Sequence, residues 1–154
     1  MVASKISEEL QRVVRVRADF LCEYCHAQEA WQHIPFTIDH LIPKSVGGKN
    51  LPENLALACF HCNRSKSARL TAIDPSTGEV VLLFNPRQHL WKEHFVWDAN
   101  GLYIVPLTAI GRATCDLLDF NRERAVRIRQ ADLEVKRHPP AGDPILAADP
   151  TFER

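Results

Sequence analysis

The chain has 154 residues, of which 45% are hydrophobic and 25% are charged, and its 19 basic and 19 acidic side chains give a formal net charge of zero. This length is enough for one globular domain with its own core. The charge balance excludes a protein that coats nucleic acid by bulk electrostatics, because such domains have a marked basic excess. No apolar run approaches the roughly 18 residues of a membrane span, and the first residues lack the pattern of a signal peptide. We therefore expect a cytoplasmic protein without a membrane partner.

Four of the five cysteines form two pairs, each with two residues between its members: Cys22 and Cys25, then Cys59 and Cys62. Without an export signal, such pairs favour metal binding over disulfides, because cytosolic thiols are kept reduced. Each tight turn points both sulfurs to one side, so the two pairs can hold Zn²⁺ tetrahedrally at about 2.3 Å. Zinc with four sulfur ligands has no open position for water, so we expect it to be structural. His26 follows the first pair directly and His61 lies inside the second pair, and both are less favoured alternative ligands.

The first half of the chain predicts a helix, a hairpin and a second helix. Residues 7–17 have a serine cap, acidic residues in the first turn and helical apolar spacing. Short β-rich runs at 35–42 and 55–57 predict a hairpin with a wide loop around Gly47 and Gly48. A short helix is predicted over 63–70, ending before Pro75 and Gly78. These elements form a ββα unit between and around the cysteine pairs.

The second half predicts a small antiparallel sheet followed by helices. Strands are expected over 79–84, 93–97 and 102–105, and one or two helices are expected over 108–118 and 121–137. Cys115 lies in the helical stretch and is predicted to be a buried, inert thiol. The fold class is therefore α+β, in three parts: a core with its leading helix over 1–74, a sheet with a helical extension packed on that core over 75–138, and a flexible tail over 139–154.

A candidate reactive group stands at the end of the first predicted strand, where Asp39 offers a carboxylate beside the imidazole of His40. Asn63, at the start of the following helix, offers a carbonyl oxygen. One carboxylate and one amide leave most of an octahedral shell to water and phosphate, as a magnesium-type ion prefers. Taken singly, His40 can equally be a structural histidine, Asp39 a turn residue, Asn63 a helix cap and Asn54 a loop residue.

Together these motifs resemble the HNH endonuclease family, in its branch with a four-cysteine zinc site. The resemblance covers roughly residues 18–70 and rests on the two cysteine pairs, Ile38–Ser45, Gly47-Gly48, Asn54-Leu55 and Cys59–Lys66. It implies that the core has a ββα-metal fold of treble-clef type. The last position of the family motif is asparagine rather than histidine in this chain, a variant that is common in the family.

The resemblance also implies roles for single residues. His40 is the implied general base, which activates water for attack on a DNA phosphodiester bond. Asp39 and Asn63 are the implied ligands of a catalytic divalent ion, Mg²⁺ or another such as Mn²⁺ or Ni²⁺. Asn54 is implied to brace the hairpin loop through backbone hydrogen bonds and so to aim His40.

DNA is the expected partner, contacted through local basic clusters because the chain has no net charge. The two candidate clusters are Arg64, Lys66 and Arg69, and then Arg122, Arg124, Arg127, Arg129, Lys136 and Arg137. Lys44 and Lys66 can contact phosphate or remain solvated charges. The alternative to a nuclease is a non-catalytic, zinc-stapled module that binds nucleic acid or protein, and a role within a larger nucleic-acid-processing assembly is also open. The sequence does not predict the oligomeric state.

Overall fold

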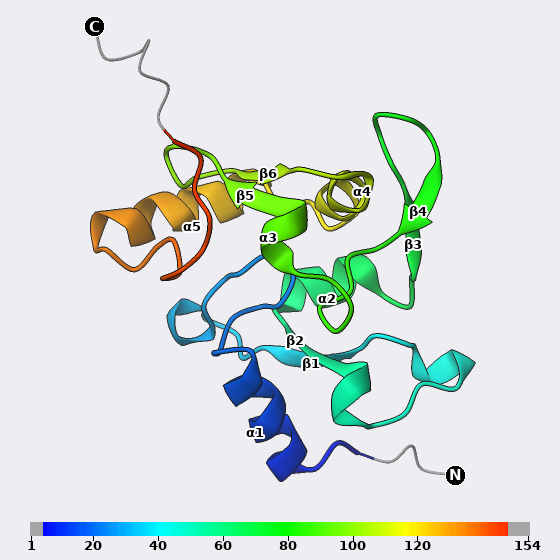
Figure 1. Ribbon diagram of the computed structural model, residues 1–154. Helices are drawn as coiled ribbons and strands as arrows, with labels where there is room; N and C mark the ends of the chain where they lie inside the picture. Colours follow the sequence, from blue (N-terminus) through cyan, green and yellow to red (C-terminus); the bar gives the residue numbers. More distant parts are fainter. Residues whose placement is uncertain (1–4, 148–154) are drawn as a thin grey trace, which may run out of the picture. The chain divides into compact units, whose positions relative to one another are not determined.

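A computed structural model describes residues 5–147 (Figure 1). Its residues group into two compact units. The first unit contains residues 5–70 together with the segment 85–89, and the second contains residues 71–84 and 90–147. The fold is α+β, with antiparallel two-stranded hairpins, an N-terminal helix and C-terminal helices.

The first unit begins with helix α1, Glu8–Arg17. The hydroxyl of Ser7 accepts a hydrogen bond from the backbone N–H of Leu10 at 3.2 Å, which satisfies one of the free donors of the first turn. Val14 faces the core, and α1 packs against the second strand of the following hairpin. Arg17 at the end of the helix donates to the carbonyl oxygens of Pro52 and Leu55, which ties α1 to that strand.

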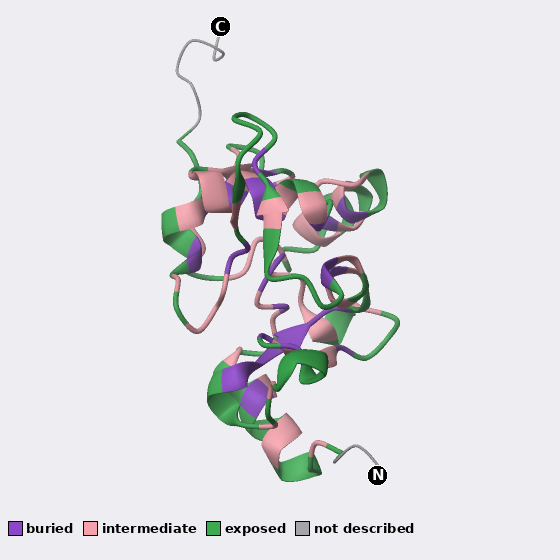
Figure 2. Cartoon of the chain, turned by 90° about the vertical axis from the view of Figure 1, so that its right-hand side faces the viewer, coloured by how far each residue is buried: buried purple, intermediate pink, exposed green. Residues whose placement is uncertain are grey.

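The hairpin consists of β1, Thr37–His40, and β2, Leu55–Ala58, paired antiparallel with His40 opposite Leu55. All four residues of β2 are buried, and Figure 2 shows this strand within the buried part of the unit. Helix α2, Phe60–Lys66, follows directly and packs against both strands. It starts three residues before the predicted start and ends four before the predicted end, because Ser67 takes a positive φ of 51° that breaks the helix.

The wide loop between β1 and β2 contains the short 3₁₀ turns Lys44–Val46 and Pro52–Asn54, and a third turn, Glu29–Trp31, lies before β1. Gly48 is required in this loop, since a Cβ atom there would lie 1.7 Å from the carbonyl oxygen of Ile42. Gly47 has a φ of 95°, in the region that favours glycine. The glycine pair therefore lets the loop fold back closely on the residues that follow β1.

The second unit contains two separate hairpins and three helices. Strand β3, Thr71–Ile73, pairs with β4, Val80–Leu82, and β5, Phe95–Trp97, pairs with β6, Ile104–Pro106. The helices are α3, Trp91–His94, α4, Ala109–Leu117, and α5, Glu123–Glu134. The expected sheet is thus divided into two hairpins, and β3 lies just after the predicted helix, where the sequence predicted no strand.

Aromatic side chains form the core of this unit. Phe95 contacts Phe84, Trp91 and Phe120, each with ring centroids 5.3–5.4 Å apart. The guanidinium of Arg129 lies 5.0 Å from the ring centroid of Trp97 and donates to the carbonyl oxygens of Leu102 and Phe120. Arg129 is buried, so it does not belong to the basic surface cluster that the sequence indicated.

Part of the segment expected to be a flexible tail is held against β5. The backbone of Trp97 donates to the carbonyl oxygen of Pro144 and accepts from Leu146, and its indole N–H donates to Asp143 at 2.9 Å. These bonds extend β5 on its free edge by a parallel bridge at Ile145. The remainder of that segment, residues 148–154, lies outside the described residues.

Candidate active site and zinc centre

The four paired cysteines converge in the first unit. Cys22, Cys25, Cys59 and Cys62 are all buried, and their sulfur atoms lie within 4.8 Å of one another. In each pair the backbone N–H of the second cysteine donates to the sulfur of the first, at 3.5 Å for Cys25 to Cys22 and 3.4 Å for Cys62 to Cys59. Four converging sulfurs of this kind fit a tetrahedral Zn²⁺ site.

The electrostatics of the cysteine cluster also favour a cation. Burial raises the pKa of the Cys22 thiol well above its usual range, whereas hydrogen bonding, first of all from Cys22, lowers the pKa of Cys25. Without a cation, four neighbouring thiolates would repel one another in a buried site, so they cannot all ionise. A divalent ion removes this conflict, because it binds the thiolate form.

His40 stands at the last position of β1 and is half-buried. Its Nε2 atom lies 2.7 Å from the side-chain oxygen Oδ1 of Asn50, in the loop. Because an amide oxygen only accepts hydrogen bonds, this contact favours the tautomer with hydrogen on Nε2. In that tautomer Nδ1 keeps its lone pair and can accept a proton.

Asn54 connects the two ends of the loop. Its Oδ1 accepts from the backbone N–H of Ile42 at 2.8 Å, and its Nδ2 donates to the carbonyl oxygens of Ile42 and Lys49 at 3.1 and 3.0 Å. Its own carbonyl oxygen accepts from Leu41. The residue is buried, so these bonds replace bonds to water and hold the backbone just after His40.

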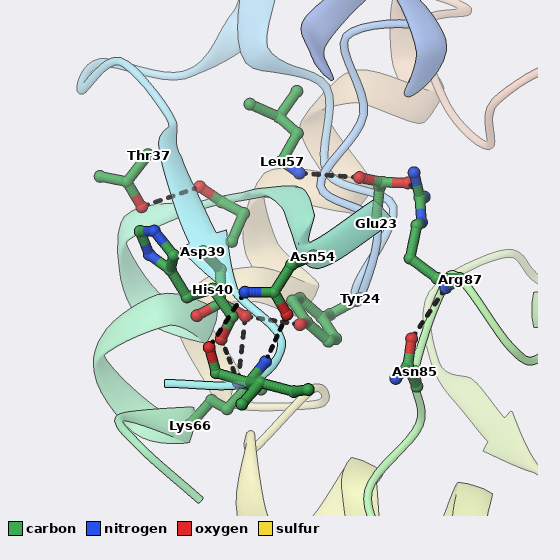
Figure 3. Close-up of polar contacts among 12 residues, drawn as sticks. Glu23, Tyr24, Thr37, Asp39, His40, Asn54, Leu57, Lys66, Asn85 and Arg87 are labelled. Carbon is green, nitrogen blue, oxygen red and sulfur yellow. Dashed lines mark hydrogen bonds and ion pairs between the residues drawn. The ribbon is translucent and has the colours of Figure 1, made fainter. Parts of the chain in front are cut away.

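Asp39 is buried, and one of its carboxylate oxygens has two partners (Figure 3). Oδ2 accepts from the hydroxyl of Tyr24 at 2.6 Å and lies 3.1 Å from the Nζ atom of Lys66. Burial, with the negative charge of Asp39 as the next cause, raises the pKa of Tyr24 well above its usual range, so its hydroxyl stays protonated and donates. Tyr24 lies between Cys22 and Cys25, so this hydrogen bond joins the first cysteine turn to Asp39.

Asn63 is the middle residue of α2, one helical turn before Lys66. Residues three apart lie on the same side of a helix. Lys66 reaches Asp39, so helical spacing puts Asn63 on the same side of α2 as Lys66. A carboxylate oxygen and an amide oxygen are ligands that suit a hard divalent cation with several water or phosphate ligands.

A further ion pair fixes the first cysteine turn to the hairpin. The carboxylate of Glu23 accepts the backbone N–H of Leu57 at 2.7 Å through one oxygen and pairs with Arg87 through the other (Figure 3). Arg87 belongs to the segment 85–89, which explains why that segment groups with the first unit. Arg87 therefore has a structural function at this point.

The sequence alone did not indicate that three residues contact Asp39 or His40: Tyr24, Asn50 and Lys66. The sequence indicates Lys66 only as a phosphate contact or a solvated charge, whereas its side chain is 3% exposed and paired with Asp39. Arg64, Arg69 and Lys44 are exposed, as expected for surface cations. Cys115 lies apart from the cysteine cluster, is half-buried, and burial raises the pKa of its thiol to about 11.

Comparison with known protein families finds a match within the first unit. Residues 22–69 match the model of the family described as HNH endonuclease. This range contains both cysteine pairs, the β1–β2 hairpin and α2. Neither the curated proteins nor the solved structures include a significant match to the chain. Among the described residues, no helix combines the length and the apolar character that crossing a membrane requires.

Proposed function

We propose that the chain is a metal-dependent endonuclease that hydrolyses phosphodiester bonds in DNA, because residues 22–69 match the HNH endonuclease family model. The observation that supports this most strongly is the environment of His40. Its Nε2 atom forms a hydrogen bond with Asn50, and the residue before it is the buried Asp39. Asn54 holds the backbone that follows His40 through its hydrogen bond to Ile42. A histidine held in this way has one ring nitrogen available as a base.

In this proposal His40 removes a proton from the attacking water. The neutral imidazole accepts the proton at Nδ1 while Asn50 keeps the ring in place through Nε2. General-base assistance of this kind contributes about 10²–10⁴-fold to a rate. The imidazole must be neutral to accept this proton. The expected products have 5′-phosphate and 3′-hydroxyl ends.

Asp39 and Asn63 would hold the catalytic divalent ion, which supplies charge stabilisation at the scissile phosphate and the leaving oxygen when it is bound. Mg²⁺, Mn²⁺ and Ni²⁺ are the candidates. The protein's part is to present one carboxylate oxygen and one amide oxygen from two different elements, β1 and α2. Tyr24 contributes by fixing the orientation of the Asp39 carboxylate.

The four cysteines would hold the structural Zn²⁺. Such sites contribute about 10–16 kcal/mol in small domains, which is comparable with the whole stability of a chain of this size. The zinc would therefore be needed for the folded state of the first unit, and it would have no direct part in the chemistry.

One observation favours the alternative, a zinc-stapled binding module without chemistry. The charge of Asp39 is already compensated by Lys66, and a buried ion pair can serve structure alone. A module of that kind would use exposed cations such as Arg64 and Arg69 for contact and would not need a divalent ion. The nuclease is preferred because His40 follows the pair directly in β1 and Asn63 lies one helical turn before Lys66 in α2.

The test is a cleavage assay with zinc-loaded protein on supercoiled plasmid, single-stranded DNA and modified DNA, with Mg²⁺, Mn²⁺ and Ni²⁺ added separately. We expect cleavage that depends on the added ion, and that Asp39→Asn strongly reduces both the rate and its dependence on the ion. Asparagine is chosen because it preserves the size and part of the hydrogen bonding beside Lys66. Binding to these DNAs without any cleavage would favour the binding module.

A further inference from the structure

The ion pair between Asp39 and Lys66 is among the most enclosed polar contacts of the first unit. The two side chains are 5% and 3% exposed, and the charged atoms lie 3.1 Å apart. The ammonium group of Lys66 also lies 3.4 Å from the carbonyl oxygen of His40. A buried charge without a partner is costly, so neither side chain can leave the pair for water without a large penalty.

The pair involves only one side of the Asp39 carboxylate. Both Tyr24 and Lys66 contact Oδ2. Neither of these two contacts uses Oδ1, so Oδ1 is the oxygen left for another ligand. Lys66 and Asn63 lie on the same side of α2. A cation held by Asp39 and Asn63 would therefore have a positively charged amino group as a near neighbour.

The charges of the site do not favour a free divalent ion. Asp39 contributes one negative charge, Lys66 one positive charge, and the amides of Asn63 and Asn50 none. These four side chains together are thus neutral before any ion enters, and repulsion between the ion and the nearby ammonium group of Lys66 is strong at short range in a partly buried site. A phosphodiester group would add the missing negative charge and further oxygen ligands.

From this balance we propose that Lys66 keeps the affinity of the free protein for its catalytic divalent ion low, so that the ion binds firmly only together with a DNA phosphate. The inference rests on the proposed function, in which Asp39 and Asn63 are the ion's ligands. It assigns Lys66 a regulatory role in ion binding and separates that role from a direct contact with phosphate.

The experiment measures Mn²⁺ binding to the zinc-loaded full chain without DNA, by the electron paramagnetic resonance signal of free Mn²⁺. Lys66→Met removes the charge with little change in volume, and we expect Mn²⁺ to bind roughly tenfold more tightly than to the wild type. Arg64→Met is the matched control, because it removes an equal charge from an exposed position of the same helix. Arg64→Met should leave the affinity within about twofold of the wild type. Lys66→Arg, which keeps the charge, should also behave as the wild type.

A substitute variant and two further measurements complete the experiment. If Lys66→Met loses its zinc, Lys66→Gln, which retains hydrogen-bond donors, replaces it in the comparison. A short DNA duplex added in a His40→Ala background, where we expect no cleavage, should raise the Mn²⁺ affinity of the protein with Lys66 in place. Asp39→Asn should abolish Mn²⁺ binding with and without DNA, which would identify Asp39 as a ligand of the ion.

The proposal is overturned if the charge-removing variant binds Mn²⁺ no more tightly than the wild type, or if DNA does not raise the affinity of the protein with Lys66 in place. These results do not depend on cleavage. A protein that never cuts DNA but shows the predicted Mn²⁺ affinities would contradict the proposed function and leave the role of Lys66 standing. If the wild type cuts DNA but Lys66→Met binds Mn²⁺ no more tightly than the wild type, the proposed function stands and the role of Lys66 is contradicted.

Discussion

The Nε2 atom of His40 lies 2.7 Å from Oδ1 of Asn50, ten residues further along the chain. This contact joins the end of β1 to the far side of its loop and determines which ring nitrogen can act as a base. Asn50→Leu removes the acceptor, so we expect the ring to lose its fixed orientation and cleavage to slow by about 10–100-fold. Asn50→Asp keeps an acceptor and should retain more of the activity.

The readout that separates positioning from general damage is the tautomer itself. ¹⁵N chemical shifts of the His40 ring in neutral solution should show hydrogen on Nε2 in the wild type and in Asn50→Asp. In Asn50→Leu the same shifts should indicate a mixture of tautomers. An unchanged tautomer and rate in Asn50→Leu, with zinc retained, would show that the contact with Asn50 does not orient the base.

The cysteine cluster predicts a sharp difference between two cysteine substitutions. Cys59→Ser removes one of four converging sulfurs, so we expect loss of zinc and of the cooperative unfolding transition of the first unit. Cys115→Ser is the matched control and should keep one zinc ion per chain, because Cys115 lies outside the cluster. Metal analysis and thermal unfolding measure both. Cys59→Ser protein with full zinc and a normal melt would contradict the zinc assignment.

The arginines of α5 should separate into structural and surface groups. Arg129→Met leaves the carbonyl oxygens of Leu102 and Phe120 without their donor, so we expect it to reduce the free energy of unfolding by about 2–4 kcal/mol. Arg124 and Arg127 are exposed, so replacing both with Met should change stability by less than about 1 kcal/mol. The double variant should weaken DNA binding and reduce its salt dependence by about two units of slope. Unchanged binding would show that α5 does not face DNA.

Asp74 predicts how the stability of the second unit depends on pH. Its buried carboxylate accepts hydrogen bonds from two nitrogens of the Arg112 guanidinium, at 2.9 and 2.7 Å. This hydrogen bonding holds the pKa of Asp74 well below its usual range. A carboxyl group with a lowered folded-state pKa contributes stability above its unfolded pKa of about 4, and this contribution is lost as the pH falls further.

Arg112→Met should therefore melt at a lower temperature than the wild type at pH 7, and the difference should shrink below about pH 4, where the carboxyl group of Asp74 takes up a proton in the unfolded chain. Thermal unfolding of both proteins from pH 7 to pH 3 measures this. A difference in melting temperature that stays constant over the whole range would mean that the Asp74–Arg112 pair does not provide the pH-dependent stability.

The parts of the fold that repeat a local pattern could be predicted from the sequence. The cap at Ser7 and the β1–β2 hairpin follow from short-range residue preferences, and the spacing of the cysteines alone predicts that they form a metal cluster. The end of α2 could not be predicted, because it depends on the unusual backbone of Ser67. Strand β3 is three residues long and mostly exposed, so it lacks an apolar periodicity.

The site was predictable only where residues lie next to one another in the motif. Lys66 is a charged residue in a basic stretch, and its burial depends on a partner 27 positions earlier in the chain, Asp39. Asn50 is one of several polar residues in a loop, and only the folded loop brings it to His40. Arg129 resembles its basic neighbours in sequence, yet the ring of Trp97 and two carbonyl oxygens make it part of the core.

The measurement that tests the central claim most directly is the rate of plasmid cleavage by His40→Ala, compared with wild-type protein at equal zinc content. His40 touches neither the cysteine cluster nor, in this account, the catalytic ion, so the variant should keep its zinc, its melting temperature and its DNA affinity. We expect cleavage to fall by at least about 10²-fold. A His40→Ala protein that still cuts DNA at the wild-type rate would contradict the assignment of His40 as the base.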